Sequence, residues 1–367
     1  MDLDQLRNEL DQVDEKLIRL AARRQRLVKK IGRVKRTSGK KTRDFKREKD
    51  VIEGVRRVAM EEDVSPDLAE QLIKLLIESS LTEQEQDQVA AQAQGHERRA
   101  LIIGGGGRMG LWFAEFVTSQ GYAVEIADPA GVPEGYEGAT DWKSLELTHD
   151  LILVAAPLRA SARILHELAE HRPSGVVCDI GSLKSPLEDG LHALREAGVS
   201  VTSIHPMFGP EAQLLSGRHV VFINLGDDEA TEMVRDLFHP TMAKQVEMTL
   251  EEHDVAMAFV LGLSHATNLA FVEAMRQSGL SAEKLASLSS TTFDAQLGIA
   301  EQVFSENPHL YFEIQALNSS GVRAVDVLVQ SAESLKQSVE DLDEPAFVEV
   351  MRKGNAYLSN RSSIEAV

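Results

Sequence analysis

Apolar residues recur every three to four positions through the first 34 residues of the chain. This spacing puts them on one face of a helix, so it predicts a long helix that packs along another helix. Arg24 takes a place on that face where an apolar residue is expected, and Lys35, about three turns later, points in roughly the same direction. Because a buried guanidinium without a partner is costly, we expect Arg24 to meet an anionic group, and a bound dicarboxylate would serve. The apolar positions are Leu3, Leu6, Leu10, Val13, Leu17, Leu20, Leu27, Ile31 and Val34.

Two further helical patterns follow in the first hundred residues. One spans about 44–60, and the other starts at Ser65-Pro66-Asp67, where Ser is a favourable N-cap and Pro suits the first helical position. The apolar stripe of this third helix continues as Ser80 and Gln84, at helical spacing but now polar. Each of the three predicted helices therefore places polar residues on a surface where an interior is expected.

From residue 99 the pattern changes to short apolar runs that alternate with helical segments, as in a doubly wound α/β domain. After about residue 250 only helical patterns remain, among them 255–271 and 347–358. With 367 residues the chain exceeds the size at which single cores stop growing. We therefore predict a multi-domain fold with an all-α three-helix domain over 1–92, an α/β Rossmann domain over 99–250 and an all-α C-terminal domain over 251–367. The predicted strands span 100–103, 123–128, 150–155, 175–179 and 199–203.

A glycine-rich turn, Gly104–Gly110, follows the first of these strands and precedes a helix predicted over 111–120. Its glycines fit the dinucleotide-binding fingerprint, in which the backbone approaches the pyrophosphate at a helix N-terminus. Asp128 ends the second strand, where a carboxylate accepts from the ribose 2′-hydroxyl and repels a 2′-phosphate. This order of strand, glycines, helix, strand and acid is specific, so it predicts NAD as the cofactor in preference to NADP. The expected cofactor-binding residues are Gly105, Gly107, Arg108, Met109, Gly110 and Asp128.

Two later loops follow predicted strands at the edge where doubly wound sheets bind their ligands. The first, Ile180–Lys184, contains Ser182, and the second, Ile204–Pro210, contains His205. Two prolines and a glycine follow His205, which predicts a stiff loop that fixes the imidazole. Position and rigidity favour a functional histidine over a structural one.

Composition narrows the possible functions. The net charge is −19, yet residues 1–50 hold 17 Lys and Arg against 9 Asp and Glu, a balance of +8, so the rest carries −27. A basic start can indicate nucleic acid, a solvated helix face or a site for a small anion. Nucleic acid is the weakest of these, because Phe45 is the one aromatic residue in that stretch.

Several classes of protein are disfavoured by what the sequence lacks. It shows no run of eighteen apolar residues and no signal core, which argues against a membrane span and against secretion. The single Cys178 is expected to be buried and fits a reducing cytoplasm. No His or Cys cluster has the spacing of metal ligands, so we expect no metal.

The helical segment resembles the all-helical chorismate mutase family over nearly all of residues 1–90, through motifs such as Val13-Asp14-Glu15-Lys16-Leu17 and Arg43-Asp44. The resemblance implies a homodimer with an active site shared between two intertwined protomers. Chorismate rearranges unimolecularly, so the site has to hold a compact conformer and stabilise charge on the breaking C–O oxygen, without a nucleophile or metal. The resemblance implies Arg7 of the partner subunit, Arg24 and Arg47 for the carboxylates, Lys35 and Gln84 for the ether oxygen, Asp44 and Glu48 for the ring hydroxyl, and Ser80 in the same site.

The remainder, from residue 100 to about 345, resembles the prephenate dehydrogenase family, and a mutase joined to it resembles the bifunctional enzymes of tyrosine synthesis. In the family reaction prephenate loses hydride from the ring carbon that bears its hydroxyl, and the ring carboxylate leaves as carbon dioxide. The resemblance implies a neutral His205 that accepts from this hydroxyl, Ser182 as a second contact to it, and His265 in the substrate site. It also implies that the C-terminal helices dimerise. The matching segments are Gly104–Gly110, Asp179–Lys184, His205–Pro210, Glu252-His253-Asp254 and Ser264-His265-Ala266, in which His253 could instead cap or pack a helix.

One position departs from that family. In many members the segment Leu288–Leu297 contains an Arg that binds the ring carboxylate, whereas this chain has Asp294. The candidates to replace it are Arg323, Arg276 and Arg218. An alternative is a pair of 4-amino-4-deoxy substrates, whose ammonium an acid could help to hold. A non-catalytic alternative is a redox-sensing helical arm on an NAD-binding module, and another is a plain coiled-coil dimerisation arm. Neither of them would need the polar residues of the arm at these spacings.

Overall fold

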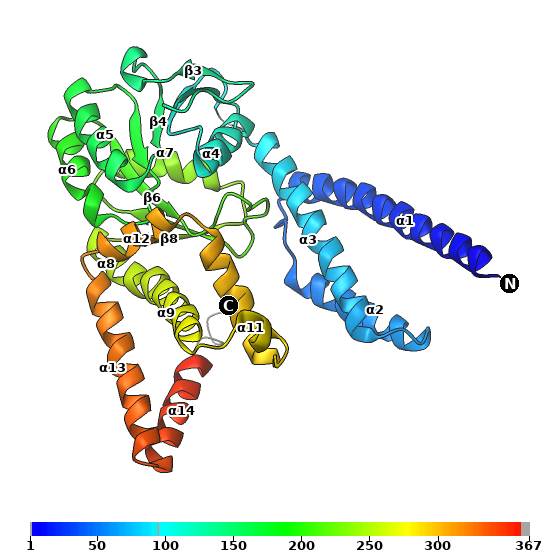
Figure 1. The fold of residues 1–367 in the computed structure, drawn as a ribbon. Helices are drawn as coiled ribbons and strands as arrows, with labels where there is room; N and C mark the ends of the chain where they lie inside the picture. Colours follow the sequence, from blue (N-terminus) through cyan, green and yellow to red (C-terminus); the bar gives the residue numbers. More distant parts are fainter. Residues whose placement is uncertain (1, 94, 361–367) are drawn as a thin grey trace. The chain divides into compact units, whose positions relative to one another are not determined.

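The computed structural model describes residues 2–93 and 95–360 of the chain (Figure 1). The chain divides into two compact units, of which the first comprises Met1–Gly181 and Leu187–Thr249 and the second Ser182–Pro186 and Leu250–Val367. The predicted fold class is confirmed: helices come first, then a Rossmann-like sheet with helices, then helices again. The residue limits proposed for the three domains stay a prediction.

The N-terminal arm consists of the helices α1 (Leu3–Thr37), α2 (Phe45–Glu61) and α3 (Pro66–Ala91), as the periodicity predicts. Asp2 and Gln5 form a capping box at the start of α1, and Ser65 caps α3. Helices α1 and α2 each pack against α3.

The apolar face of α1 is uncovered in the single chain. Residues 2–20 are exposed throughout, and Leu10 and Leu17 on the predicted seam are 59% and 57% exposed. Burying a leucine side chain stabilises a protein by about 1.5–3 kcal/mol, so a long row of exposed ones leaves much apolar surface in water. In the described arm the buried hydrophobic residues are Ala59, Leu81 and Val89. The arm therefore presents a face that suits a second helix.

Within the described residues, eight strands form one sheet at the centre of the first unit, in the order β3-β2-β1-β4-β5-β6-β7-β8 (Figure 1). Neighbouring strands are parallel except for the antiparallel pair of β6 and β7. The five predicted strands are present, with ends shifted by a few residues, whereas β3, β7 and β8 were not predicted. The bounds are β1 Arg99–Ile103, β2 Ala123–Ala127, β3 Glu137–Ala139, β4 Leu151–Val154, β5 Val176–Asp179, β6 Val201–Pro206, β7 His219–Ile223 and β8 Lys244–Met248.

The strands build the main core of this unit. Ile102, Leu153 and Phe222 are completely buried, as expected for a largely parallel sheet covered by helices. Cys178 in β5 is completely buried too, which confirms the prediction for this residue. The helical segments between the strands are α4 (Arg108–Ser119), η1 (Trp142–Ser144), α5 (Leu158–His171), η2 (Ser185–Leu187), α6 (Glu188–Glu196) and α7 (Asp228–Phe238).

The prediction of a stiff loop around His205 is wrong. His205 and Pro206 are the last residues of β6, and His205 pairs with Val221 of β7. Proline is tolerated there because it stands at the end of its strand. The imidazole is therefore carried by a buried strand of the sheet, which fixes it more firmly than a loop would.

The described part of the second unit is helical, as predicted, apart from the short segment Ser182–Pro186. The helix predicted over 255–271 is a composite of α8 (Leu250–Met257), the π-helix η3 (Ala258–Leu263) and α9 (Ser264–Gln277). Such π segments often occur at functional sites, and this one ends two residues before His265. The other helices are α10 (Ala282–Ala286), α11 (Thr291–Ser305), α12 (Pro308–Ala316), α13 (Gly321–Glu340) and α14 (Glu344–Ser359).

One helical run, Leu250–Gln277, is long and apolar enough to cross a membrane by length and composition. The sequence, which has no run of eighteen apolar residues, predicts no membrane span. The core helix of a non-membrane protein passes the same test, and this run buries His253 and Asp254 near its start. Because ionisable side chains are costly in lipid, these two residues favour packing within the protein.

Candidate active sites

A cavity of about 670 Å³ opens at the carboxyl ends of β1, β2 and β4. This edge of a doubly wound sheet is where ligands bind. Gly104, Gly106 and Asp128 line the cavity, with Ala155–Pro157 after β4. Helix α4 begins after Gly107, and no side chain caps it. Since the first N–H groups of a helix lack an acceptor within the helix, this end of α4 suits a phosphate group.

Close packing explains the third glycine of the fingerprint. A Cβ atom on Gly110 would lie 2.2 Å from the carbonyl oxygen of Gly104, so only glycine lets α4 start against the turn. The carboxylate of Asp128 reaches the same turn, since its Oδ2 accepts from the backbone N–H of Gly106 at 2.9 Å. The residues of this cavity therefore fit a dinucleotide.

His205 is 6% exposed and lies on β6 in the first unit. Ser182, which we expect to contact the same substrate hydroxyl, is half-buried and belongs to the second unit. Their pairing stays a prediction.

A buried carboxylate without an assigned role holds the loop that contains Ser182. The Asp254 carboxylate accepts the backbone N–H groups of Lys184 at 2.8 Å and of Ser185 at 2.6 Å, and the Ser185 hydroxyl also donates to it. His253 Nδ1 lies 2.7 Å from Oδ1 of the same carboxylate. Burial by itself would raise the pKa of Asp254, but the hydrogen bonds from His253, Ser185 and Lys184 lower it to about 2. In the sequence, Asp254 is marked by its place beside His253 in the segment Glu252-His253-Asp254, which resembles the prephenate dehydrogenase family.

His265 lies half-buried on α9, where its ring stacks on Tyr311 of α12 with 4.1 Å between the ring centroids. Burial lowers the pKa of His265 and so favours the neutral imidazole. Its Nδ1 is buried without a hydrogen-bond partner among the described residues. A nitrogen of this kind is suited to a ligand contact.

Asp294 is exposed in the first turn of α11, and the Ser289 hydroxyl donates to its carboxylate. An acid in this position interacts favourably with the helix dipole, which gives Asp294 a structural role. Arg276 is held on α9 by an acidic neighbour through two hydrogen bonds of 2.7 Å. Arg218 is exposed just before β7 in the first unit, whereas Arg323 is exposed in the first turn of α13 in the second unit.

In the arm, Arg24 reaches across to α3. Its Nη1 donates to Ser80 Oγ at 2.5 Å and to the carbonyl oxygen of Leu76 at 2.6 Å. Both partners are neutral, and in the described part of the chain no acid forms an ion pair with Arg24. The Arg24 side chain is half-buried, and this burial lowers the pKa of its guanidinium. The structure thus brings together Arg24 and Ser80 and leaves the positive charge for an anion.

Lys35 and Glu48 lie at the loop that joins α1 to α2. The ammonium of Lys35 donates to the carbonyl oxygen of Thr42 at 2.7 Å. Glu48 accepts two hydrogen bonds from Arg43, at 3.0 and 2.9 Å, so its carboxylate is held in a fixed orientation. Arg43 belongs to the motif Arg43-Asp44, but no local pattern predicts its contact with Glu48.

Gln84 is 7% exposed, and its Oε1 has no hydrogen-bond partner among the described residues. Asp44 caps α2 by accepting from the backbone N–H of Arg47 at 3.0 Å. The side chain of Arg47 is exposed in the single chain.

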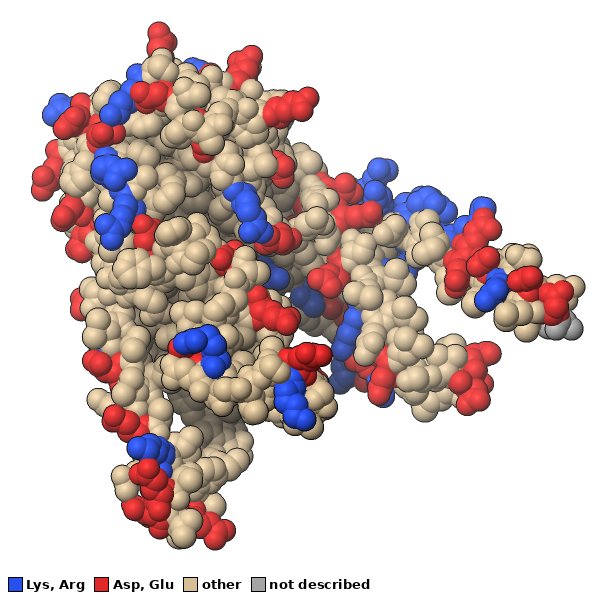
Figure 2. All heavy atoms as spheres, viewed as in Figure 1, with Lys and Arg blue, Asp and Glu red and all other residues tan. Residues whose placement is uncertain are grey.

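Arg7 lies far from these residues in its own chain. It is exposed on α1 and 17 positions before Arg24, which is roughly 25 Å along a helix. Figure 2 shows further Lys and Arg side chains along α1. If Arg7 serves a mutase site, that site has to be on another chain.

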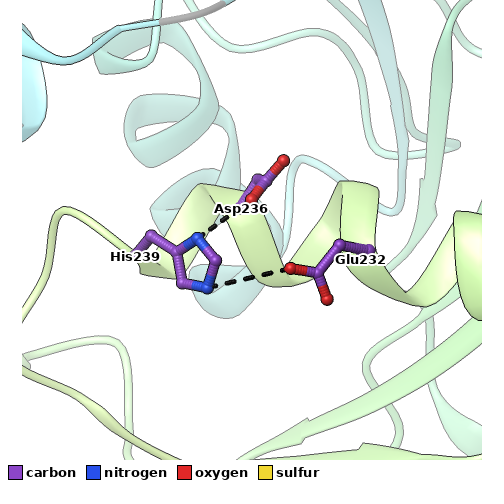
Figure 3. Close-up of side chains that lie close together, drawn as sticks. All are labelled: Glu232, Asp236 and His239. Atoms are coloured by element: carbon purple, nitrogen blue, oxygen red, sulfur yellow. Dashed lines mark ion pairs between the residues drawn. The ribbon is translucent and has the colours of Figure 1, made fainter.

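A group with possible metal-ligating atoms lies on α7 and just after it (Figure 3). His239 Nδ1 lies 2.9 Å from Asp236 Oδ1, and its Nε2 lies 4.0 Å from Glu232 Oε1. Arg235 also pairs with Glu232, at 3.5 Å. Glu232 and His239 are exposed, so these contacts are those of surface ion pairs, and we assign no metal to them.

A dinucleotide cavity on a doubly wound sheet, followed by a helical unit, defines a nucleotide-dependent dehydrogenase with a helical domain in front of it. The chain matches three families: chorismate mutase type II over residues 6–85, the nucleotide-binding domain of prephenate dehydrogenase over 128–247, and its dimerization domain over 249–353. It belongs to the bifunctional chorismate mutase and prephenate dehydrogenase family of tyrosine biosynthesis.

Relatives of similar length support this assignment. The T-protein of Enterobacter agglomerans is 26% identical over 348 residues, which cover 95% of this chain and 90% of the relative. The T-protein of Haemophilus influenzae is 24% identical over 356 residues, covering 96% and 91%. Prephenate dehydrogenase from Aquifex aeolicus in complex with hydroxyphenyl propionate and NAD+ shares the fold, with a TM-score of 0.60 and 21% identity over 72% of this chain and 98% of that one.

Proposed function

We propose that the arm rearranges chorismate to prephenate and that the dehydrogenase part converts prephenate to 4-hydroxyphenylpyruvate and carbon dioxide with NAD. The observation that carries this proposal is the presence, in one chain, of a dinucleotide cavity and of the half-buried Arg24, which has no acidic partner among the described residues. The alternative with 4-amino-4-deoxy substrates is not favoured, because the T-proteins match nearly the whole chain.

In the mutase site, Arg24 and Arg47 bind the two carboxylates of chorismate together with Arg7 of the partner subunit. Lys35 and Gln84 donate to the ether oxygen, where negative charge grows as the C–O bond breaks. Glu48 and Asp44 hold the ring hydroxyl, and Ser80 orients Arg24. The hydrogen bonds from Arg24 to Ser80 and from Arg43 to Glu48 support these roles, because they restrain the side chains before substrate binds.

In the dehydrogenase site, His205 accepts the hydrogen bond of the substrate hydroxyl, and Ser182 gives a second contact to it. The bound nicotinamide supplies the hydride acceptor. His265 contributes its neutral imidazole to the substrate pocket, in agreement with its lowered pKa. Aromatisation of the ring drives the reaction, so orientation and one hydrogen-bond acceptor are the main demands on the chain.

Arg323 is the residue that we assign to the ring carboxylate in place of the missing arginine. It lies in the first turn of α13, four residues after Ser319, whose hydroxyl oxygen lies 3.2 Å from that of Ser185. The chain around Arg323 is therefore tied to the loop that contains Ser182. A cation near a helix N-terminus is unfavourable unless an anion accompanies it, which supports a ligand role.

We propose NAD in preference to NADP. Asp128 would repel a 2′-phosphate at the end of β2. Lys143 also lines the cavity, but its ammonium pairs with Glu167 at 2.9 Å, which offsets its attraction for a phosphate. The glycine turn, with Gly105, Gly107, Arg108, Met109 and Gly110, holds the pyrophosphate.

We propose a homodimer in the cytoplasm that binds no nucleic acid and no membrane. The uncovered face of α1 and the match to a dimerization domain support the dimer. The buried single cysteine supports a reducing compartment.

Turnover by the purified full chain tests the proposal. Loss of chorismate absorbance without any cofactor measures the mutase, and reduction of NAD with supplied prephenate measures the dehydrogenase. We expect both. A chain that consumes 4-amino-4-deoxyprephenate and leaves prephenate untouched would contradict the proposed substrate, and a chain inert towards chorismate would contradict the proposed mutase.

A further inference from the structure

The loop between β6 and β7 of the nucleotide-binding part contacts the mutase arm at a buried carboxylate. Glu85 on α3 is 4% exposed, and each of its carboxylate oxygens accepts a backbone N–H of the other part. Oε2 accepts from Leu215 at 2.7 Å, and Oε1 accepts from Met242 at a short distance as well. Glu85 follows Gln84 directly on the helix, so these bonds restrain the backbone that carries a proposed mutase residue.

A second contact involves the next residue of the same loop. Arg43 donates through Nη1 to Ser216 Oγ at 2.6 Å, while its Nε and Nη2 hold the carboxylate of Glu48. One guanidinium thus joins the loop to a second proposed mutase residue. Because the fork of Arg43 is planar, a hydroxyl at one side and a carboxylate at the other fix its orientation.

The loop is itself anchored to the sheet unit. Trp112 on α4 donates through its indole N–H to the carbonyl oxygen of Ala212 at 2.9 Å, and Arg108 forms an ion pair with Glu211. The turn is closed by a hydrogen bond of 2.9 Å from the N–H of Arg218 to the carbonyl oxygen of Leu215, with Gly217 at φ +80°. A glycine adopts this angle without strain, so the turn presents Leu215 and Ser216 in a defined geometry.

We infer that the loop Glu211–Arg218 holds the mutase site in order from outside, with Arg43 and Glu85 as positioning residues beside the substrate-binding residues proposed above. The inference rests on the proposed mutase function. Chorismate rearrangement depends on holding one conformer against preorganised donors, so loosening Gln84 and Glu48 should lower kcat more than it raises KM. The arm would then be a full mutase only while it is docked on the nucleotide-binding part.

The test uses the full chain with substitutions at two positions in this contact. Ser216→Ala removes the hydroxyl that accepts from Arg43, and Ser216→Thr restores it. Glu85→Gln keeps the shape of the side chain but replaces one accepting oxygen with a donor NH2 group, which opposes one of the two backbone N–H groups. Ser200→Ala and Glu61→Gln, at exposed positions outside the contact, serve as matched controls.

We expect Glu85→Gln to lower the mutase kcat roughly tenfold and Ser216→Ala about threefold, because small misplacements near a reacting group are costly. Ser216→Thr should restore the rate. Oxidation of supplied prephenate should stay within about twofold of the wild type, which shows that the variants are folded. If Glu85→Gln fails to fold, the comparison of Ser216→Ala with Ser216→Thr still tests the inference.

Two outcomes separate this inference from the function on which it rests. If the wild-type protein shows no mutase turnover, the proposed mutase function is contradicted. The wild type could instead be active while the Ser216 and Glu85 variants have the same mutase kcat as the controls. That result would contradict the inference about the loop and leave the proposed function in place.

Discussion

The nucleotide-binding part and the helical arm differ in how far each buries its apolar residues within a single chain. The sheet unit buries its central strands within one chain, as Leu101 and Leu153 show. The arm leaves Leu10, Leu17 and Ile31 about half exposed. A sheet covered on both faces closes its own core, whereas a long helix exposes one whole side until a second helix covers it. The difference fits the proposal that the mutase activity depends on a second chain, whereas the cofactor cavity of the dehydrogenase is formed within one chain.

The largest effect that we expect is on the side of the dehydrogenase. His205→Asn keeps a polar side chain on β6 but removes the imidazole acceptor, so oxidation of prephenate should fall by about 10³-fold. Chorismate turnover by the same protein should stay at the wild-type rate. Equal loss of both activities would mean that the two parts share one site.

Lys35→Ala is the corresponding substitution in the arm, and it should affect the mutase activity alone. The ammonium that stabilises the breaking C–O oxygen is lost, so mutase kcat should fall by roughly 10²–10³-fold. Oxidation of supplied prephenate measures the control activity and should not change. Mutase activity that survives this substitution would exclude Lys35 from the role proposed for it.

A charge on the exposed seam tests whether the arm needs a second chain. Leu17→Asp places a carboxylate on the apolar face and should lower mutase activity by about tenfold or more at low protein concentration, because Arg7 of the partner subunit is lost with the contact. Ile18→Asp is the control, since Ile18 is 72% exposed and lies off the predicted seam. Similar loss in both variants would argue against a seam-specific effect.

A smaller change is expected at the cofactor. Asp128→Ala removes the acceptor for the ribose hydroxyl and the charge that repels a 2′-phosphate. A hydrogen bond to a charged group contributes about 1.5–3 kcal/mol, so kcat/KM with NAD should fall roughly tenfold or more, while kcat/KM with NADP rises. Steady-state rates with both cofactors measure the ratio of kcat/KM for NAD to that for NADP. An unchanged ratio would mean that Asp128 does not select the cofactor.

The smallest effect concerns stability in acid. The pKa of Asp254 is depressed from 3.8 to about 2 in the folded chain, so its carboxylate stabilises the fold above pH 4 and this contribution of about 2 kcal/mol is lost as the pH falls through 2. Denaturant unfolding at pH 7 and at pH 3 measures the first part of this loss, about 1 kcal/mol, because pH 3 lies between the two pKa values. Asp254→Asn should narrow the difference between the two pH values, and a variant that keeps the full difference would point to other carboxylates.

Much of the fold could be predicted from local pattern. Helical spacing located α1 and α3, and the glycine turn with Asp128 located the cofactor cavity, because each rests on neighbours within a few turns or one βαβ unit. Pattern failed for β8, where Lys244–Met248 alternates charged, polar and apolar residues at the edge of the sheet. It also failed at His205, because pairing with β7 extended the strand through a segment whose prolines favour a loop.

The contacts around the sites depend on the tertiary structure. The bond from Lys184 to Asp254 spans 70 residues, that from Leu215 to Glu85 spans 130, and that from Arg43 to Ser216 spans 173. Periodicity and motifs by themselves determined most of the elements, the place of the dinucleotide cavity and which polar residues interrupt apolar faces. Only the folded chain decided which backbone groups those carboxylates and guanidinium groups bind, because hydrogen bonds between distant segments leave no local pattern in the sequence.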